Sequence, residues 1–108
     1  MVKLIALYKK PENLEEFERN YFESHLPLAS KIPGLLRAEI SRISGGPAGD
    51  PEYFLMAELY FESLDALNQG MASEAGKAAG KNLRSFAKDI VTMMVGEVEE
   101  RIPAPVGS

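Results

Sequence analysis

Two segments of this chain are apolar on both of their faces, and this feature limits the folds the chain can adopt. They are Val2–Tyr8 and Tyr53–Phe61, and each carries apolar or aromatic residues at odd and even positions alike. Successive side chains of a strand point to opposite sides of the sheet, so both sides of these strands need cover. The pattern predicts that these two strands lie at the centre of a sheet.

Between them, the sequence predicts an amphipathic helix that begins after Asn13 as N-cap, continues to about Lys31, and contains the only histidine. Its apolar stripe recurs every three or four residues, at Leu14, Phe17, Tyr21, His25, Leu28 and Ile32. Pro27 has no N–H for the carbonyl of Glu23, which predicts a kink or break between Glu23 and Pro27. His25 lies on the inward face, where an ionisable group needs a partner or a function.

Two further strands are predicted, Leu36–Ile43 and Ile90–Val98. In the first, apolar and polar residues alternate, which is typical of a strand with one buried and one polar face. The segment Gly45–Pro51 is a loop. Ser63 and Ser73 are the expected N-caps of two helices that end near residues 72 and 86. The second of these helices should be broken or weakened by two glycines, Gly76 and Gly80.

The order of elements is β-α-β-β-α-β, which predicts an α+β, ferredoxin-like fold with an antiparallel sheet and helices on one side. We expect one domain over residues 1–101 and a flexible C-terminal tail over residues 102–108. The apolar second face of the sheet needs a cover, and a second copy of the same face would supply it. Burying roughly 500 Å² there contributes about 12 kcal/mol before association costs. We therefore expect a homodimer through the sheet faces.

Composition excludes several classes of function. The net charge is −4 and no basic cluster exists, so neither nucleic acid nor membrane is an expected partner. The chain has no cysteine and one histidine, and no phosphate-binding glycine loop or nucleophile elbow, so neither a metal nor a cofactor is expected. Without a signal peptide or membrane span, a cytoplasmic location is expected.

The motif Tyr21-x-x-x-His25-x-Pro27-Leu28-Ala29, followed by Ile32-Pro33-Gly34-Leu35, resembles the signature helix of the EthD family, named for ethyl tert-butyl ether degradation. The similarity continues through the strand of residues 53–61, residues 63–67, Phe86 and the strand of residues 91–98, and so covers about residues 2–100. It implies the dimeric α+β barrel fold.

The resemblance also implies a role in the catabolism of small hydrophobic organic compounds. One reading is a cofactor-independent enzyme of the monooxygenase, isomerase, cyclase or dehydratase type, that is, an oxidoreductase or a lyase/isomerase. The other is a non-catalytic dimer that binds such a ligand or supports an oxidative degradation system. Fold-level analogy leaves both open.

The candidate catalytic residues are His25 and Glu58. An imidazole titrates near neutral pH and suits a general acid/base, whereas a structural histidine would only bond a neighbouring carbonyl. Glu58 either faces the helices, where it could pair with His25, or faces the dimer as part of an ion pair. Candidate substrate-binding residues, which could equally fill the core, are Tyr8, Tyr21, Met56 and Tyr60.

Overall fold

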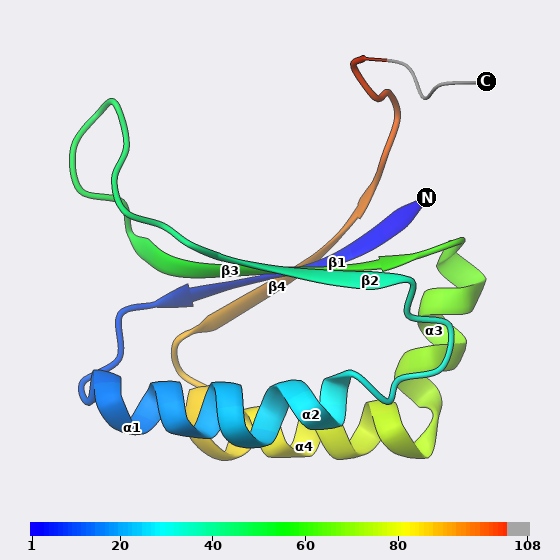
Figure 1. The fold of residues 1–108 in the computed structure, drawn as a ribbon, viewed down its shortest axis with the longest axis horizontal. Coiled ribbons are helices and arrows are strands. Elements are labelled where there is room, and N and C mark those ends of the chain that lie inside the picture. The colour runs from blue at the N-terminus through cyan, green and yellow to red at the C-terminus, as the bar shows by residue number, and fades with distance from the viewer. Residues whose placement is uncertain (104–108) are drawn as a thin grey trace.

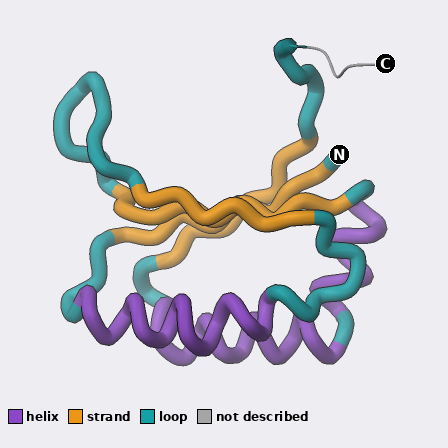
Figure 2. Tube along the Cα trace, in the orientation of Figure 1, coloured by secondary structure: helices purple, strands orange, loops and turns teal. Residues whose placement is uncertain are grey.

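A computed structural model describes residues 1–103, and the predicted tail of residues 102–108 lies mostly outside this range. Four antiparallel strands form one sheet in the order β2-β3-β1-β4, and the helices form a single layer on one of its faces (Figures 1 and 2). The elements are β1 (Val2–Lys9), α1 (Leu14–Glu18), η1 (Arg19–His25), α2 (Leu26–Ala29), β2 (Arg37–Arg42), β3 (Tyr53–Phe61), α3 (Leu64–Ala72), α4 (Glu74–Ala87) and β4 (Val91–Glu97). The predicted α+β, ferredoxin-like plan is confirmed, with the two most apolar strands at the centre.

Side-chain caps fix where the three helical regions begin. Asn13, Ser63 and Ser73 each accept a hydrogen bond from the backbone N–H three residues later, at 3.0, 3.1 and 3.1 Å respectively. Each cap satisfies a donor that has no partner inside its helix. The three predicted N-caps are thereby confirmed.

The first helical region does not break at its proline. Instead, α1 passes into the π-helix η1, where the N–H of Leu26 bonds the carbonyl of Tyr21, and then into α2. The helix therefore does not break between Glu23 and Pro27, and the predicted departure from a regular α-helix there takes the form of a wider turn. A wider turn suits the residues before Pro27, because that residue donates no hydrogen bond and its ring needs room beside the preceding turn. Short π-helical segments occur frequently at functional sites.

The helix α4 also runs without interruption, although it contains two glycines. A Cβ atom added at Gly76 would collide with the carbonyl oxygen of Gly70 and lie 2.6 Å from that of Met71. Gly76 is thus needed for the close approach of α3 and α4. At Gly80 the nearest atom is the tip of the flexible Arg84 side chain, at 3.4 Å.

The helix-facing side of the sheet forms the core. Leu4, Ala6 and Tyr8 of β1 lie opposite Leu59, Ala57 and Leu55 of β3, respectively. They pack against helical residues in two clusters, which include Phe17, Tyr21, Ile32, Leu67, Ala79 and Leu83. This side of the sheet forms the floor of the cavity described below.

Phe54 faces the helices, and not the outer side that strict alternation along β3 predicts for it. The pairing of β1 with β3 shifts by one residue between Tyr8 and Lys9, so Phe54 has no partner in that register. Such a bulge turns a side chain to the other face. The Phe54 ring then meets Phe17 edge-on, with 5.4 Å between centroids.

The opposite face of the sheet carries no helix within residues 1–103 (Figure 1). The apolar side chains of this outer face are the partly buried Ile5, Leu7 and Met56 and the more exposed Met94. Glu58 lies opposite Ile5 on the same face and forms an ion pair with Lys3. The β2–β3 loop and the segment after β4 both rise on this side of the sheet (Figure 1). The outer face of the sheet thus lies between these two projecting segments.

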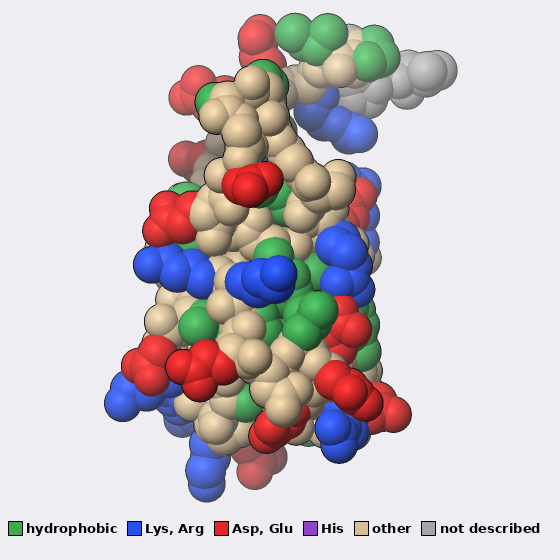
Figure 3. Space-filling view, turned by 90° about the vertical axis from the view of Figure 1, so that its left-hand side faces the viewer, with side chains coloured by type: hydrophobic (Ala, Val, Ile, Leu, Met, Phe, Trp, Pro, Cys, Tyr) green, Lys and Arg blue, Asp and Glu red, His purple; other side chains and the backbone are tan. Residues whose placement is uncertain are grey.

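The remaining surface shows no concentration of one charge where it can be seen. At the end of the molecule that carries the β2–β3 loop, acidic and basic side chains are interspersed (Figure 3). Of the helices within residues 1–103, none combines the length and apolar character needed to cross a membrane.

Candidate functional site

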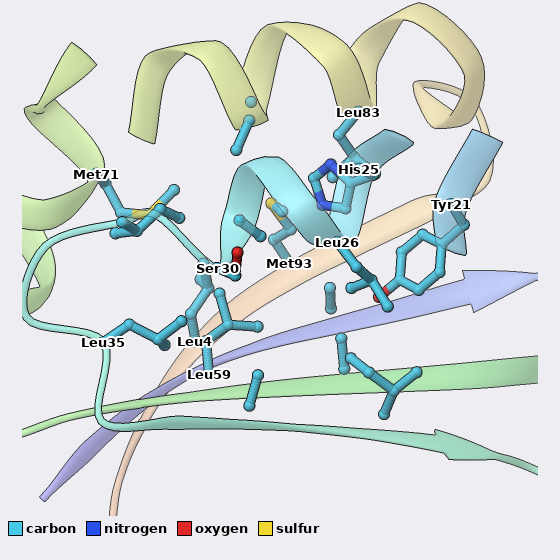
Figure 4. A pocket seen from close by; sticks show the side chains of 18 of the residues that line it. Leu4, Tyr21, His25, Leu26, Ser30, Leu35, Leu59, Met71, Leu83 and Met93 are labelled. Carbon is cyan, nitrogen blue, oxygen red and sulfur yellow. The ribbon is translucent and has the colours of Figure 1, made fainter. Parts of the chain in front are cut away.

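A cavity of about 460 Å³ lies between the sheet and the helices (Figure 4). Its walls come from all four strands and from η1, α2, α3 and α4, and most of them are aliphatic. The polar side chains among the lining residues are few: Tyr8, Tyr21, His25 and Ser30. Arg37 borders the cavity, but its guanidinium lies over the Tyr60 ring on the other face of the sheet, 4.2 Å from the ring centroid. Such a site suits a small, mostly apolar compound that carries one or two polar groups.

His25 is the last residue of η1 and is 8% exposed. One nitrogen of its imidazole points toward α4 and the other toward the cavity (Figure 4). The nitrogen next to α4 is Nδ1, which is buried without a hydrogen-bond partner among the described residues. Burial lowers the pKa of His25 below its usual value of 6.5, while the Asn82 side chain and the Ala79 carbonyl act in the opposite direction. The imidazole is therefore neutral at pH 7 and able to accept a proton.

Tyr21 lies one turn before His25 and shares the inward face of η1, as predicted. The two ring centroids are 5.4 Å apart and the rings are tilted by 31°. The Tyr21 hydroxyl points toward the sheet (Figure 4). Burial raises the pKa of Tyr21 to about 12, although a hydrogen bond from Tyr8 lowers it in part. The phenol therefore stays protonated and can donate a hydrogen bond into the cavity.

Tyr8 reaches the same cavity from the floor. Its ring meets Tyr21 edge-on, with 5.2 Å between centroids. Burial, followed by the neighbouring Tyr21, raises the pKa of Tyr8 far above its usual value of 10. Two of the four predicted substrate-binding residues, Tyr8 and Tyr21, thus lie in the cavity beside His25.

The other predicted site residues lie on the outer face of the sheet. Glu58 bonds the Lys3 ammonium at 2.7 Å, and β3 places it on the side away from His25. Tyr60 lies on the same side, where its hydroxyl donates to Glu39 at 3.0 Å, and Met56 is there too. Alternation placed these three residues on one face but did not show which face the helices cover. Of the two predicted positions for Glu58, the structure thus shows the one away from the helices, with Lys3 and not His25 as its partner.

Within residues 1–103, no group of three histidine, cysteine or acidic side chains is close enough together to hold a metal ion. The residues that line the cavity include no aspartate or glutamate. The proton-transfer chemistry that this chain can supply in the cavity therefore centres on one imidazole and two phenols.

One polar residue beside the site was not singled out from the sequence. Asn82 of α4 adjoins the imidazole of His25, and its side-chain Oδ1 is buried without a partner among the described residues. The helical spacing of the sequence could have indicated it, because Asn82 lies three residues after Ala79 and four before Phe86. This spacing places Asn82 at the edge of the inward-facing stripe of α4.

The family model of the EthD domain matches the sequence over residues 9–90, which include η1 and the part of the cavity floor contributed by β3. A solved EthD family protein from Bacillus halodurans is 45% identical, with a TM-score of 0.87 over 91% of this chain and 98% of that one. A curated relative from Rhodococcus erythropolis, described as an uncharacterised 11.0 kDa protein in the thcB–thcC intergenic region, is 29% identical over 103 residues. The match covers 95% of this chain and all of the relative.

More distant structures share the fold. SnoaB, a cofactor-independent oxygenase from Streptomyces nogalater, superposes with a TM-score of 0.71 at 16% identity, over 95% of this chain and 97% of that one. A protein from Bacteroides fragilis, described as dimeric and ferredoxin-like, has a TM-score of 0.63 at 22% identity, over 90% and 95% of the two chains.

Proposed function

This chain belongs to the EthD family, and from that premise we propose that it is a cofactor-independent enzyme that acts on a small hydrophobic compound, with His25 as general acid/base. The observation that carries the proposal is the position of His25. It is the only histidine of the chain, it lines an apolar cavity, and burial lowers its pKa so that it is neutral at pH 7.

The first step is removal of a proton. A neutral Nε2 atom that faces the cavity accepts a proton from a carbon next to a carbonyl group of the ligand. The C–H bond breaks, and its electron pair forms an enolate whose charge lies on the carbonyl oxygen. Return of the proton to another atom completes an isomerisation, and the same enolate can start a cyclisation or an elimination. A monooxygenase reaction would use molecular oxygen as its co-substrate.

Tyr21, which accepts a hydrogen bond from Tyr8, supplies the second requirement of such a step. A developing enolate oxygen is stabilised by hydrogen-bond donors that are already in place. The Tyr21 hydroxyl remains protonated because burial raises its pKa, and its own O–H is free for the ligand because Tyr21 accepts the hydrogen bond from Tyr8. The surrounding walls are aliphatic, and this strengthens each hydrogen bond by keeping water away.

We further propose that the protein is a homodimer through the outer face of the sheet. Ile5 and Met94 lie side by side there, as do Leu7 and Met56, with no helix over them within the described residues. Exposed apolar patches of this kind mark interfaces. The Bacteroides fragilis protein of similar fold is described as dimeric, which supports this arrangement.

A second function is favoured by one observation, which is that the cavity lining contains no carboxylate. A non-catalytic dimer that binds a hydrophobic compound, or supports an oxidative system, needs only the apolar walls. The enzyme and the non-catalytic dimer are distinguished by whether the bound compound exchanges a proton.

The test uses 2-tetralone, a small aromatic ketone whose acidic C–H groups exchange with deuterium in D₂O. Proton NMR gives the exchange rate with the native protein, with His25→Gln, and with Glu23→Gln, an exposed change on the same helix. The proposal predicts a rate about 100-fold lower in His25→Gln and unchanged in Glu23→Gln. Equal rates in all three would overturn the acid/base role, and binding without exchange would favour the carrier.

A further inference from the structure

Two buried polar atoms face one another across the helix layer without partners. They are Nδ1 of His25 on η1 and Oδ1 of Asn82 on α4, and neither forms a hydrogen bond of good geometry within the described residues. Most buried polar side-chain atoms in proteins have a hydrogen-bond partner, and leaving one unsatisfied costs about 1–3 kcal/mol. Two such atoms on neighbouring side chains therefore call for a shared explanation.

The groups on α4 decide which of them must donate. The Ala79 carbonyl also adjoins the imidazole, and a backbone carbonyl can only accept a hydrogen bond. Asn82 lies one turn after Ala79, so the same side of α4 presents a second oxygen, Oδ1. Nδ1 points toward this side (Figure 4). A ring nitrogen that meets two acceptors is satisfied only when it carries a hydrogen.

We propose that Asn82 is a positioning residue for His25, whose Oδ1 accepts the Nδ1 hydrogen and thereby holds the neutral imidazole in the tautomer with Nε2 unprotonated toward the cavity. The direction of a ring nitrogen's hydrogen bond sets the tautomer of the ring. A general base needs an Nε2 atom with a free lone pair. This inference therefore deepens the proposed function, and the role it gives to Asn82 rests on that function.

The opposite orientation of the Asn82 amide would give the other tautomer of the imidazole. If the Asn82 amide is turned by 180°, its NH₂ group donates to Nδ1, and the proton of the neutral imidazole moves to Nε2. The cavity would then receive a hydrogen-bond donor in place of a base. The two arrangements differ at a single proton, which NMR can locate.

The experiment is a long-range ¹H–¹⁵N spectrum of the ¹⁵N-labelled full-length protein, without ligand, at pH 7.5. The chain has one histidine, so one imidazole is observed and its assignment is certain. The expected pattern has a protonated Nδ1 and an unprotonated Nε2. In Asn82→Leu the pattern should shift largely to a protonated Nε2, and in the exposed control Lys81→Ala it should stay native. A native ring protonated on Nε2, or an unchanged pattern in Asn82→Leu, would overturn the proposal.

A second variant keeps the test decisive if Asn82→Leu fails to fold. Asn82→Asp places a carboxylate against Nδ1–H, and the pKa of His25 should rise by about 1 to 3 pH units. An unchanged pKa would contradict contact between the two side chains. The tautomer is measured without turnover, so it can hold even if 2-tetralone exchange does not depend on His25. That outcome would leave Asn82 as the partner of a structural histidine and would end the enzyme proposal alone.

Discussion

The rings of Tyr21 and His25 lie 5.4 Å apart between centroids, one turn from each other on a π-helix that forms a wall of the cavity. A phenol that remains protonated and an imidazole that remains neutral thus share one side of an apolar space. A ligand can therefore meet a hydrogen-bond donor and a proton acceptor at the same time. Each group alone is common in a protein core, and their combination in a cavity carries the functional argument.

The change Tyr21→Phe should lower the 2-tetralone exchange rate about tenfold, because one hydrogen bond to the enolate oxygen is lost. The fold should persist, since the ring keeps its stack on Phe17, with 5.6 Å between centroids and 9° between planes. Urea unfolding should show a loss of about 1–3 kcal/mol, because the buried Tyr8 hydroxyl loses its acceptor. A stable variant with the native exchange rate would remove Tyr21 from the chemistry.

The pH dependence of stability should carry a contribution from His25. Burial lowers its pKa in the folded state below the value of about 6.5 in the unfolded chain. Between the two values the unfolded chain binds more protons, so folding stability rises with pH in this window. The contribution is complete above about pH 6.5 and is lost as the pH falls toward the folded pKa, by about 1.4 kcal/mol per pH unit between the two values.

Urea unfolding at pH values from 5.0 to 7.5 measures this contribution when the native protein is compared with His25→Gln. The free energy of unfolding of the variant should fall less steeply below pH 6.5. Since the carboxylates are the same in both proteins, their effects cancel in the difference. Parallel curves for the two proteins would show that the pKa of His25 is the same folded and unfolded.

Two glycines of α4 should respond to alanine in opposite ways. Gly80→Ala should stabilise the protein by about 0.5–1 kcal/mol, because alanine favours helix and only the Arg84 tip must move. Gly76→Ala should destabilise it severely, since the new Cβ would collide with the backbone of α3. Thermal unfolding of both variants checks this, and a tolerated Gly76→Ala would show that the α3–α4 contact is looser than described.

A charge on the outer face should separate the proposed dimer. Met94 is 44% exposed in one chain, so Met94→Lys leaves the core intact and places an ammonium group between two apolar sheets. At micromolar concentration the native protein should sediment at twice its 11.9 kDa chain mass, and Met94→Lys should shift toward a single chain. The matched control is Leu64→Lys, because Leu64 is 51% exposed on α3, outside the sheet. A native monomer would exclude the interface.

The element order was predictable because local signals agreed with one another. Ser63 and Ser73 are strong N-caps, and each is followed by helix-forming residues. The alternation of Arg37, Glu39 and Ser41 with apolar neighbours identified β2 and its polar face. The π-helix was not predictable in the same way, since a missing N–H at Pro27 can be accommodated by a break, a kink or a wider turn.

The candidate site was predictable only in part. The stripe that contains Tyr21 and His25 shows that both point inward, whatever the sheet does. Glu58 required tertiary information, because alternation gives two faces of β3 without saying which one the helices cover. The face of Phe54 also required the structure, because a bulge shifts the register of β3 beside it. Asn82 comes from a helix far along the chain and meets His25 only after folding.

The central claim is that His25 acts as a neutral base in the cavity, and its single imidazole allows one direct measurement. The 2-tetralone exchange rate, corrected for the rate with His25→Gln, is recorded against pH and compared with the NMR titration of His25. The rate should rise with pH, and the midpoint of this rise should equal the midpoint of the imidazole titration. That midpoint should lie below pH 6.5. An exchange rate that ignores the titration, or a midpoint at or above 6.5, would contradict the claim.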